Sequence, residues 1–493
     1  VKTGAGTLTL NSANSYTGGT SVAAGKVALD ANTALGLGAA TFAKDTELSL
    51  GISKGVSVAN AIKTDGVITQ SNNFDSSLTG VISGTGSLVK EGTGLLSLTG
   101  ANSYSGGTQV AAGKVALDAN TALGLGAATF AKDTELSLGI SKGVSVANAI
   151  KTDGVITQSN NFDSSLTGVI SGTGSLVKEG TGLLSLTGAN SYSGGTQVAA
   201  GKVALDANTA LGLGAATFAK DTELSLGISK GVSIANAIQV DGMVSVSSNG
   251  FDSSLTGIVN GVGRLVKEGA GNLTLTGINT YEGGTQVDAG KLSISQDANL
   301  GKAGANIAIN NATLALTDSM TVSRTMSLMN SAMIDTTTGS SSSLAGIVNG
   351  AGQLVKEGAG SLTLTGINTY EGGTQVNNGT LAISQDANLG KAGTNIAINN
   401  ATLALTDSVD LTHSVSVANT ATIDIANFNS SLMSVVSGSG TLNKAGTGTL
   451  SLQGANTFNG ILDVQAGRIA INNANSLGAD TNSVMLANGT SLE

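Results

Sequence analysis

Residues 89–110 read VKEGTGLLSLTGANSYSGGTQV, and this stretch decides the fold because it recurs along the chain. Its first half alternates apolar and polar residues, and its second half is rich in Gly, Asn and Ser. Versions of the line begin at Val1, Val89, Val177, Val266, Val355 and Asn443. These starting residues lie 88 or 89 residues apart, and self-similarity at a fixed spacing is typical of a repeat architecture. We therefore divide the chain into repeats 1–88, 89–176, 177–265, 266–354, 355–442 and a partial repeat 443–493.

Each repeat contains several short runs with one apolar face, such as KVALD near Val115, TELSL near Leu136 and GVITQ near Ile156. Alternation with a period of two predicts β-strands, and the Gly, Asn and Asp residues between the runs predict turns. No sustained helical period is present, and an antiparallel sandwich does not require near-identical lines at a fixed spacing. We predict an all-β, right-handed parallel β-helix (β-solenoid) that forms a single domain over residues 1–493. The runs recur about every 20 residues, which gives about four coils per 88-residue repeat.

The composition agrees with this fold and excludes several functions. The chain has no Pro, which would interrupt a hydrogen-bonded ladder, and 71 Gly. Charged residues make up 11 %, the net charge is −9 and aromatic residues make up 3 %, which argues against nucleic-acid binding. Without Cys there is neither a disulfide nor a thiolate metal site. No segment is apolar enough to insert into a membrane, and Val1 starts in mid-pattern without a signal sequence, so we expect an excised piece.

The extended line VKEGTGLLSLTGANSYSGGTQVAAGKVAL resembles the autotransporter-associated β-strand repeat. The elements G-x-G-x-L-x-L, G-A-N-x-Y-x-G-G-T and A-G-K-V-A-L stand in order at 92–98, 100–108 and 112–117. The sixth copy departs from the pattern with Phe458 and NGILDV.

The resemblance implies the passenger region of an AIDA-like, type V secreted adhesin. Such a chain would be extracellular at the bacterial surface, anchored through an outer-membrane barrel absent from this chain. Its partners would be copies of itself on neighbouring cells, or a host surface protein or glycan. Its roles would be self-association, aggregation, biofilm formation or host attachment. A passive stalk that extends another domain and assists export is the alternative, and a carbohydrate-active enzyme is the third, less favoured hypothesis.

The turn after the apolar run predicts a structural corner. We expect Gly106 and Gly107 to adopt positive φ in a tight bend, and Asn102 to bond to backbone and stack on Asn of neighbouring coils. Tyr104 should pack its ring at the bend. The same roles fall to Asn190, Tyr192, Gly194 and Gly195. A ladder of tyrosines that stacks a ligand, formed by Tyr16, Tyr104, Tyr192, Tyr281 and Tyr370, is the alternative.

The recurring VKEG predicts a charged edge in which equivalent residues of successive repeats stand in register. The members are Lys90, Glu91, Lys178, Glu179, Lys267, Glu268, Lys356 and Glu357. An alternating-charge edge discourages sheet aggregation. The other interpretation is a self-recognition ladder, and this edge is our candidate self-association site.

We find no catalytic or cofactor-binding constellation, and we predict that the chain is not an enzyme. Asp45 and Glu47, repeated as Asp133 and Glu135 and as Asp221 and Glu223, stand two apart on a predicted strand. Their expected separation of about 7 Å approaches that of an inverting glycosidase, but three identical copies favour a solvated edge. His413 is the only histidine and should face solvent. We expect no cofactor; bound calcium at turns such as DANTALG stays open.

Overall fold

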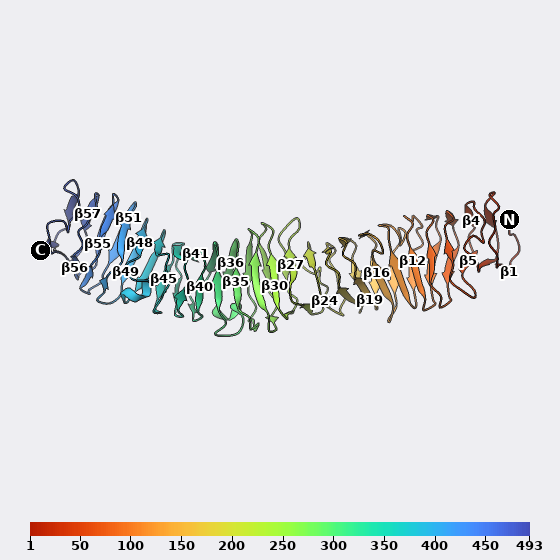
Figure 1. The fold of residues 1–493 in the computed structure, drawn as a ribbon, viewed down its shortest axis with the longest axis horizontal. Coiled ribbons are helices and arrows are strands. Elements are labelled where there is room, and N and C mark those ends of the chain that lie inside the picture. The colour runs from red at the N-terminus through yellow and green to blue at the C-terminus, as the bar shows by residue number, and fades with distance from the viewer. The chain divides into compact units, whose positions relative to one another are not determined.

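The computed structural model describes all residues, 1–493, and forms a parallel β-solenoid of about 24 turns. It has no α-helix and only two 3₁₀ turns, η1 (Asp297–Leu300) and η2 (Asp386–Leu389). This confirms the predicted all-β parallel β-solenoid; its right-handedness stays a prediction. The chain divides into two units, Val1–Val244 and Ser245–Glu493, so one continuous domain also stays a prediction. In each unit the strands lie side by side in coil after coil (Figure 1).

Apolar alternation forms the strands and the core, as β12 (Leu95–Leu98) illustrates. Leu96 and Leu98 are fully buried, while Leu95 and Ser97, which alternate with them, face outward and are partly exposed. In the next coil Val115 lies in register with Leu96, so buried aliphatic residues stack from coil to coil. Parallel strands in register therefore give each unit a continuous apolar core along its axis.

Each coil of unit 1 passes through parallel sheets in turn. Sheet 1 contains β1 (Thr7–Leu10), β3 (Lys26–Leu29), β5 (Glu47–Leu50), β8 (Val67–Gln70), β11 (Ser87–Lys90), β13 (Thr108–Val110), β15 (Ala128–Phe130), β18 (Ile150–Thr152) and β21 (Ile170–Ser171). Sheet 2 contains β2 (Thr20–Val22), β4 (Ala40–Phe42), β7 (Ile62–Thr64) and β10 (Ile82–Ser83). Within unit 1, sheet 3 contains β6 (Ser57–Val58), β9 (Ser76–Leu78), β12, β14 (Lys114–Leu117), β16 (Glu135–Leu138), β19 (Val155–Gln158), β22 (Ser175–Lys178), β24 (Thr196–Val198), β26 (Ala216–Phe218) and β29 (Ile238–Val240). Sheet 4 contains β17 (Ser145–Val146), β20 (Ser164–Leu166), β23 (Leu183–Leu186), β25 (Lys202–Leu205) and β27 (Thr222–Leu226).

Unit 2 has the same construction. The set of paired strands that we number sheet 5 within this unit contains β33 (Arg264–Glu268), β35 (Thr285–Val287), β37 (Ile307–Ile309), β40 (Met326–Leu328) and β43 (Val348–Asn349). Sheet 6 contains β31 (Ser253–Leu255), β34 (Asn272–Leu275), β36 (Lys291–Ile294), β38 (Ala312–Leu316), β41 (Ser331–Thr336), β44 (Gln353–Glu357), β46 (Thr374–Val376), β48 (Asn395–Ile398), β51 (Ser414–Val417) and β54 (Val436–Gly438). Sheet 7 contains β39 (Thr321–Val322), β42 (Ser341–Leu344), β45 (Ser361–Leu364), β47 (Thr380–Ile383), β49 (Ala401–Leu405), β52 (Thr420–Asp424), β55 (Thr441–Ala445), β57 (Ile461–Val464) and β59 (Ser483–Leu486). Sheet 8 contains β50 (Asp410–Leu411), β53 (Ser430–Leu432), β56 (Thr449–Leu452), β58 (Arg468–Ile471) and β60 (Ser491–Leu492). The chain also forms β28 (Ser233–Ile234), β30 (Met243–Ser247) and β32 (Val259–Asn260).

Successive repeats do not start on the same sheet. Four coils separate Thr7 of β1 from Ser87 of β11, because sheet 1 pairs Thr7, Lys26, Glu47, Val67 and Ser87 in turn. The residue of the second copy that is equivalent to Thr7 is Leu95, which lies eight residues beyond Ser87. Its strand, β12, therefore lies in sheet 3, and the equivalent strand of the third copy, β23, lies in sheet 4. Within unit 2 the corresponding strands β34, β45 and β56 also lie in three different sheets. A repeat is therefore about four and a third coils.

This register corrects our expectation that equivalent residues of successive repeats stack down one edge. Each repeat turns the motif by about a third of a coil, so the motif moves from face to face within a unit. Stacking in register holds between neighbouring coils and fails between neighbouring repeats.

Candidate functional site

The Asn of the corner motif joins three successive coils. Oδ1 of Asn102 accepts the backbone N–H of Ile82 at 2.8 Å, and Nδ2 donates to the carbonyl of Ala122 at 2.7 Å. Asn190 bonds in the same way to Ile170 and Ala210. The predicted bond to backbone is present, but the predicted stacking of Asn on Asn is wrong, since both partners are backbone groups.

The Tyr of the motif packs inside the corner. Tyr104 is 1 % exposed, and its hydroxyl lies 2.6 Å from Oγ1 of Thr108. The Thr108 hydroxyl donates in turn to the carbonyl of Leu123 at 3.1 Å. Burial raises the pKa of Tyr104 far above its usual value. Tyr192, Tyr281 and Tyr370 are buried to the same degree, and only Tyr16 is partly exposed. Buried rings offer no stacking face, which argues against the ligand ladder.

The two glycines of the corner have different roles. Gly107 and Gly195 adopt φ values of 84° and 85°, as expected for a tight bend. Gly106 and Gly194 do not have positive φ, so this part of the prediction is wrong. They are small because the neighbouring coil is close: a Cβ on either would lie 2.5 Å from the carbonyl oxygen of Gly86 or Gly174.

The lysines of VKEG are core residues, which contradicts the predicted charged edge. Lys90, Lys178, Lys267 and Lys356 are 0 % exposed. The ammonium of Lys90 donates to the carbonyls of Gly92 and Ala112, and the other three bond to the corresponding turns. Burial lowers the pKa of each to about 8. Lys444 in the sixth copy, also fully buried, follows the same pattern.

The glutamates of the same motif lie at the surface. Glu91 and Glu179 are exposed, and Glu268 and Glu357 are half-buried. Because their lysines point inward and successive repeats lie on different sheets, these residues form no alternating row of charge. The candidate edge is therefore replaced by isolated carboxylates beside buried cations.

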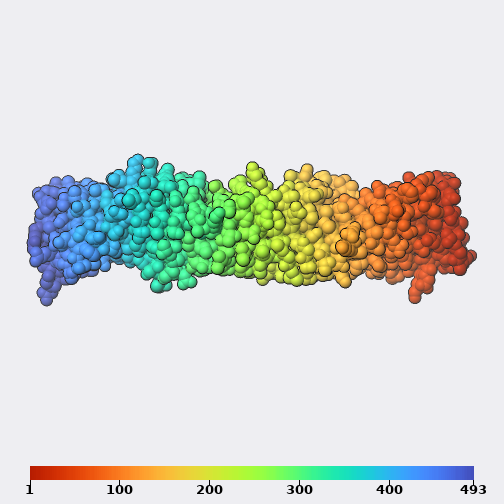
Figure 2. All heavy atoms as spheres, turned by 90° about the horizontal axis from the view of Figure 1, so that it is seen from below, coloured from red at the N-terminus to blue at the C-terminus, as the bar shows by residue number.

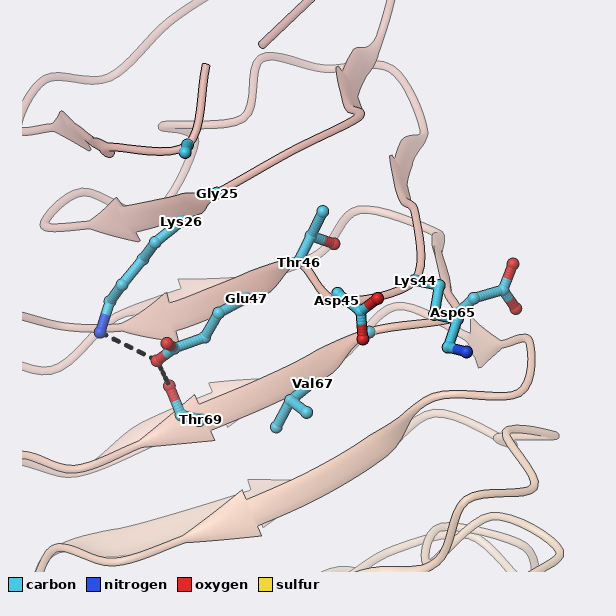
Figure 3. A pocket seen from close by; sticks show the side chains of 11 residues that line it. Gly25, Lys26, Lys44, Asp45, Thr46, Glu47, Asp65, Val67 and Thr69 are labelled. Atoms are coloured by element: carbon cyan, nitrogen blue, oxygen red, sulfur yellow. Dashed lines mark hydrogen bonds and ion pairs between the residues drawn. The ribbon is translucent and has the colours of Figure 1, made fainter. Parts of the chain in front are cut away.

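The carboxylates considered for catalysis do not form a pair. Asp45 precedes β5 and has a left-handed φ of 63°, so it stands at a turn, whereas Glu47 begins the strand. Glu47 accepts Nζ of Lys26 at 2.9 Å and the hydroxyl of Thr69 at 2.5 Å across a shallow groove, while Asp45 lies apart from them (Figure 3). Burial raises the pKa of Glu47, but the bonds from Thr69 and Lys26 outweigh it and hold the pKa below its usual value. Lys114 and Glu135, and Lys202 and Glu223, form equivalent ion pairs.

His413 is buried, not solvent-facing as predicted. It is 1 % exposed, Nδ1 lies 2.8 Å from Oδ1 of Asp386, and Nε2 has no hydrogen-bond partner. In the preceding repeat Arg324 replaces it, paired to Asp297 at 2.9 Å. In unit 1 Asn148 at the equivalent position donates to the carbonyls of Gly124 and Gly126. In all three cases the side chain at this position bonds to the loop of the preceding coil, so its role is structural.

Groups of acidic, His or Cys side chains suited to hold a metal ion are not found in residues 1–493. None of the chain's helical segments has the length and apolarity needed to cross a membrane. On the face drawn in Figure 2 the atoms of each unit cover the coils without a deep opening. The accessible features are therefore turns and shallow hollows.

Sequence reasoning missed one class of surface residue. Leu37, Leu125 and Leu213 are 62 %, 65 % and 65 % exposed, at a turn that directly follows the buried leucine of ALGLG. Further along the same segment, Ala127 and Thr129 line a hollow together with Gly106, Gly107 and Gln109. Apolar alternation does not identify such residues, because LGLG also fits a buried run; the positive φ of the intervening Gly36 and Gly124 turns the second leucine outward.

Comparison with known proteins assigns the repeated line. Six segments match the family described as Passenger-associated-transport-repeat, at residues 1–29, 88–117, 176–205, 265–294, 354–383 and 442–471. The chain is an autotransporter passenger repeat region. It is 35 % identical over 133 residues to the adhesin BmaC autotransporter of Brucella suis biovar 1 (strain 1330). That match covers 27 % of this chain and 4 % of the length of the relative. No solved structure matches the chain.

The matched segments coincide with the structure's repeating unit. In unit 1 the match at 88–117 contains β12, the buried Asn102–Tyr104 corner and β14. The family assignment confirms the resemblance drawn from the sequence, and a passenger repeat region is a surface or secreted polypeptide.

Proposed function

We propose that this passenger repeat region acts as an adhesive surface at the bacterial cell, through many weak contacts along its sides. The partners are copies of itself on neighbouring cells, or a host surface protein or glycan, and anchoring is through an outer-membrane barrel. The relation to the BmaC adhesin supports this direction. Weak contacts repeated along one chain multiply in avidity.

The observation that carries the proposal is that each repeat is turned by about a third of a coil relative to the one before it. Within unit 1, three consecutive repeats place the same outward residues on different sheets. A chain built in this way offers equivalent groups in several directions, which suits contacts among many cells more than one deep receptor site. Burial of the four VKEG lysines leaves a surface dominated by Ser, Thr, Asn and Gly.

Display of the chain on beads or on a non-clumping bacterium tests the proposal. We expect clumping that increases with chain density, or attachment to host cells or immobilised glycans. Beads coated with heat-unfolded chain are the control for non-specific stickiness. A folded, displayed chain that neither clumps nor attaches would contradict an adhesive function.

The alternative is a passive stalk, and deletion of residues 89–176 separates the two. Residues 22–88 and 110–176 are identical, so the deletion joins equivalent positions and leaves the repeat pattern intact. An adhesive surface should lose avidity with the lost repeat. A stalk should keep all activity of an attached domain.

We also propose that the region has no enzymatic role. Asp45 stands at a turn and Glu47 is held by Lys26 and Thr69, so the two do not flank a substrate bond. Glycoside hydrolysis by the usual mechanisms needs two carboxylates that face one bond.

A further inference from the structure

Unit 2 contains a short sequence motif that unit 1 lacks. The motif is Asn-x-Ser or Asn-x-Thr, at which asparagine side chains of secreted proteins accept a sugar, and it is absent from residues 1–244. In unit 2 it begins at Asn272, Asn311, Asn378, Asn400, Asn429 and Asn488. Asn311 and Asn400 stand at the same place in successive repeats, and both begin the sequence Asn-Ala-Thr.

Asn311 and Asn400 lie at exposed turns with a left-handed backbone. Their φ values are 50° and 53°, and both residues are exposed. Oδ1 of Asn311 accepts the backbone N–H of Ser331 in the next coil at 3.3 Å, and Oδ1 of Asn400 accepts that of Thr420 at 3.4 Å. Nδ2 of each asparagine bonds to no group of the chain. The amide nitrogen, which is the atom that would accept a sugar, is therefore free at the surface.

The threonines of these two copies are also available. Thr313 and Thr402 are half-buried; the hydroxyl of Thr313 meets only Sδ of Met333, at 3.8 Å, and that of Thr402 has no partner in the chain. In each of the other four copies one of the two groups is already bonded, namely Nδ2 of Asn272 and Asn378 and the hydroxyls of Ser431 and Thr490. Only Asn311 and Asn400 therefore combine a free amide nitrogen with a threonine hydroxyl that an enzyme could contact.

The turn folds without this motif, as unit 1 shows. There Asp45, with a φ of 63°, takes the left-handed position, and Glu47 follows two residues later. Unit 2 has Asn311 and Thr313 at these two positions. Asp and Asn both tolerate the left-handed conformation, so the backbone does not select Asn over Asp.

The ion pair at this turn shows that the threonine is not needed for charge balance. In unit 1 Glu47 pairs with Lys26, its register partner, at 2.9 Å. In unit 2 Thr313 is the register partner of Lys291, which pairs instead with Asp335 of β41 at 2.7 Å. Lys291 thus keeps a carboxylate partner, and the hydroxyl of Thr313 takes no part in the pair.

We propose that Asn311 and Asn400 are glycosylation sites, to which a glycosyltransferase of the bacterium that makes the chain attaches a sugar. Nδ2 attacks the anomeric carbon of a diphosphate-activated sugar. A C–N bond forms, the bond from that carbon to the phosphate oxygen breaks, and the diphosphate leaves with the electron pair. A base of the transferase takes the amide proton. The sugar stands at an exposed turn, outside the apolar core, so the coils keep their packing. This inference does not depend on the proposed adhesive function.

Mass spectrometry of the full chain, isolated from the surface of the bacterium that makes it, tests the proposal. We expect the added mass of one or more sugar residues at Asn311 and Asn400. Asn310 and Asn399, the adjacent asparagines without the motif, should be unmodified. The same chain retained in the cytosol separates two sources of sugar. A nucleotide-activated sugar modifies the chain there, whereas a lipid-linked diphosphate sugar modifies only the exported chain.

Paired variants test whether the motif directs the transfer. Asn311→Asp with Asn400→Asp copies the residue of unit 1 and should remove the sugar. Thr313→Glu with Thr402→Glu, which also copies unit 1, keeps both asparagines and should remove the sugar as completely. The matched control is Thr313→Ser with Thr402→Ser, which preserves the hydroxyl and should keep the sugar. Circular dichroism should show the same fold for all of them, because unit 1 accepts Asp and Glu at these positions.

Three outcomes would overturn the inference. One is a chain from its own cells with no sugar, and another is sugar confined to serine, threonine or lysine side chains. The third is sugar that persists on Asn311 in the Thr313→Glu variant, because transfer that ignores the hydroxyl is not directed by the motif. A chain that has the sugar but does not adhere would contradict the proposed function alone.

Discussion

The buried lysine of VKEG links neighbouring coils, because its ammonium bonds to backbone carbonyls of its own turn and of the next coil. In β11 Lys90 takes an inward position in register with Gln70 and Val110, so its stem replaces an aliphatic side chain in the core. The ammonium then meets backbone carbonyls at the turn. Long cationic side chains commonly bury their stems and place their heads at polar groups.

From the pKa shifts of the buried lysines and of the buried tyrosines we predict that the folding stability is greatest near pH 10. Burial lowers the pKa of the five lysines to about 8 in the folded state, against 10.5 unfolded, so the unfolded chain binds more protons between these values and stability rises with pH there. Burial raises the pKa of four tyrosines above 10, so stability falls once the unfolded tyrosines ionise. Urea unfolding at pH 7, 9, 10 and 11 measures this. Stability that declines steadily from pH 7 would contradict these shifts.

The burial of Lys90 was partly readable from the sequence. Alternation places Leu88 inward, Val89 outward and Lys90 inward again, as the structure has them. We assigned the residue to the surface because of its charge, although the period of two indicated the core. The acceptors of its ammonium come from turns whose geometry the sequence does not specify.

At the scale of the element, the corner is a hydrogen-bonded joint that also exists in an apolar version. Tyr104 and Thr108 pair their hydroxyls, whereas the sixth copy has Phe458 and Leu462, 3 % and 2 % exposed, at the equivalent positions. The loss of both hydroxyls together indicates that the two residues act as one unit. Removing one partner leaves a buried polar group, and removing both does not.

A double-mutant cycle tests this coupling. Tyr104→Phe should cost about 1 kcal/mol and Thr108→Val about 1–2 kcal/mol, because each leaves a buried hydroxyl or carbonyl with fewer partners. Tyr104→Phe with Thr108→Val should cost less than the sum of the two. Urea midpoints give the three values. Strict additivity would show that the hydroxyls do not depend on one another.

The corner shows which features of an element could be predicted from the sequence and which could not. Gly, Asn and Tyr in ANSYSGG correctly indicated a bend with a packed ring. The sequence does not show that Gly107 supplies the positive φ while Gly106 makes room for the carbonyl of Gly86 in the preceding coil. That close approach is a property of the stacked coils.

At the scale of the whole molecule, the rotation of the repeat follows from two lengths. A coil takes about 20 residues and a repeat takes 88, and the second is not a multiple of the first. Both lengths are visible in the sequence, but the strand lines alone do not show on which sheet a repeat begins. The register from Thr7 to Ser87 supplies that step.

A solenoid of this kind should tolerate removal of one whole coil but not of half a coil. Val67 and Ser87 are register partners, so deletion of residues 67–86 joins Gly66 to Ser87 and replaces β8 with β11 beside β5. Each coil contacts mainly its neighbours, so stability is close to a sum over coils. We expect a native circular dichroism spectrum and a melting temperature within about 4 °C of the intact chain. Deletion of residues 67–76 is the control: it removes half a coil, directs later strands to the wrong sheets and should unfold the adjoining coils. Equal tolerance of both deletions would mean that the register between coils does not govern the fold.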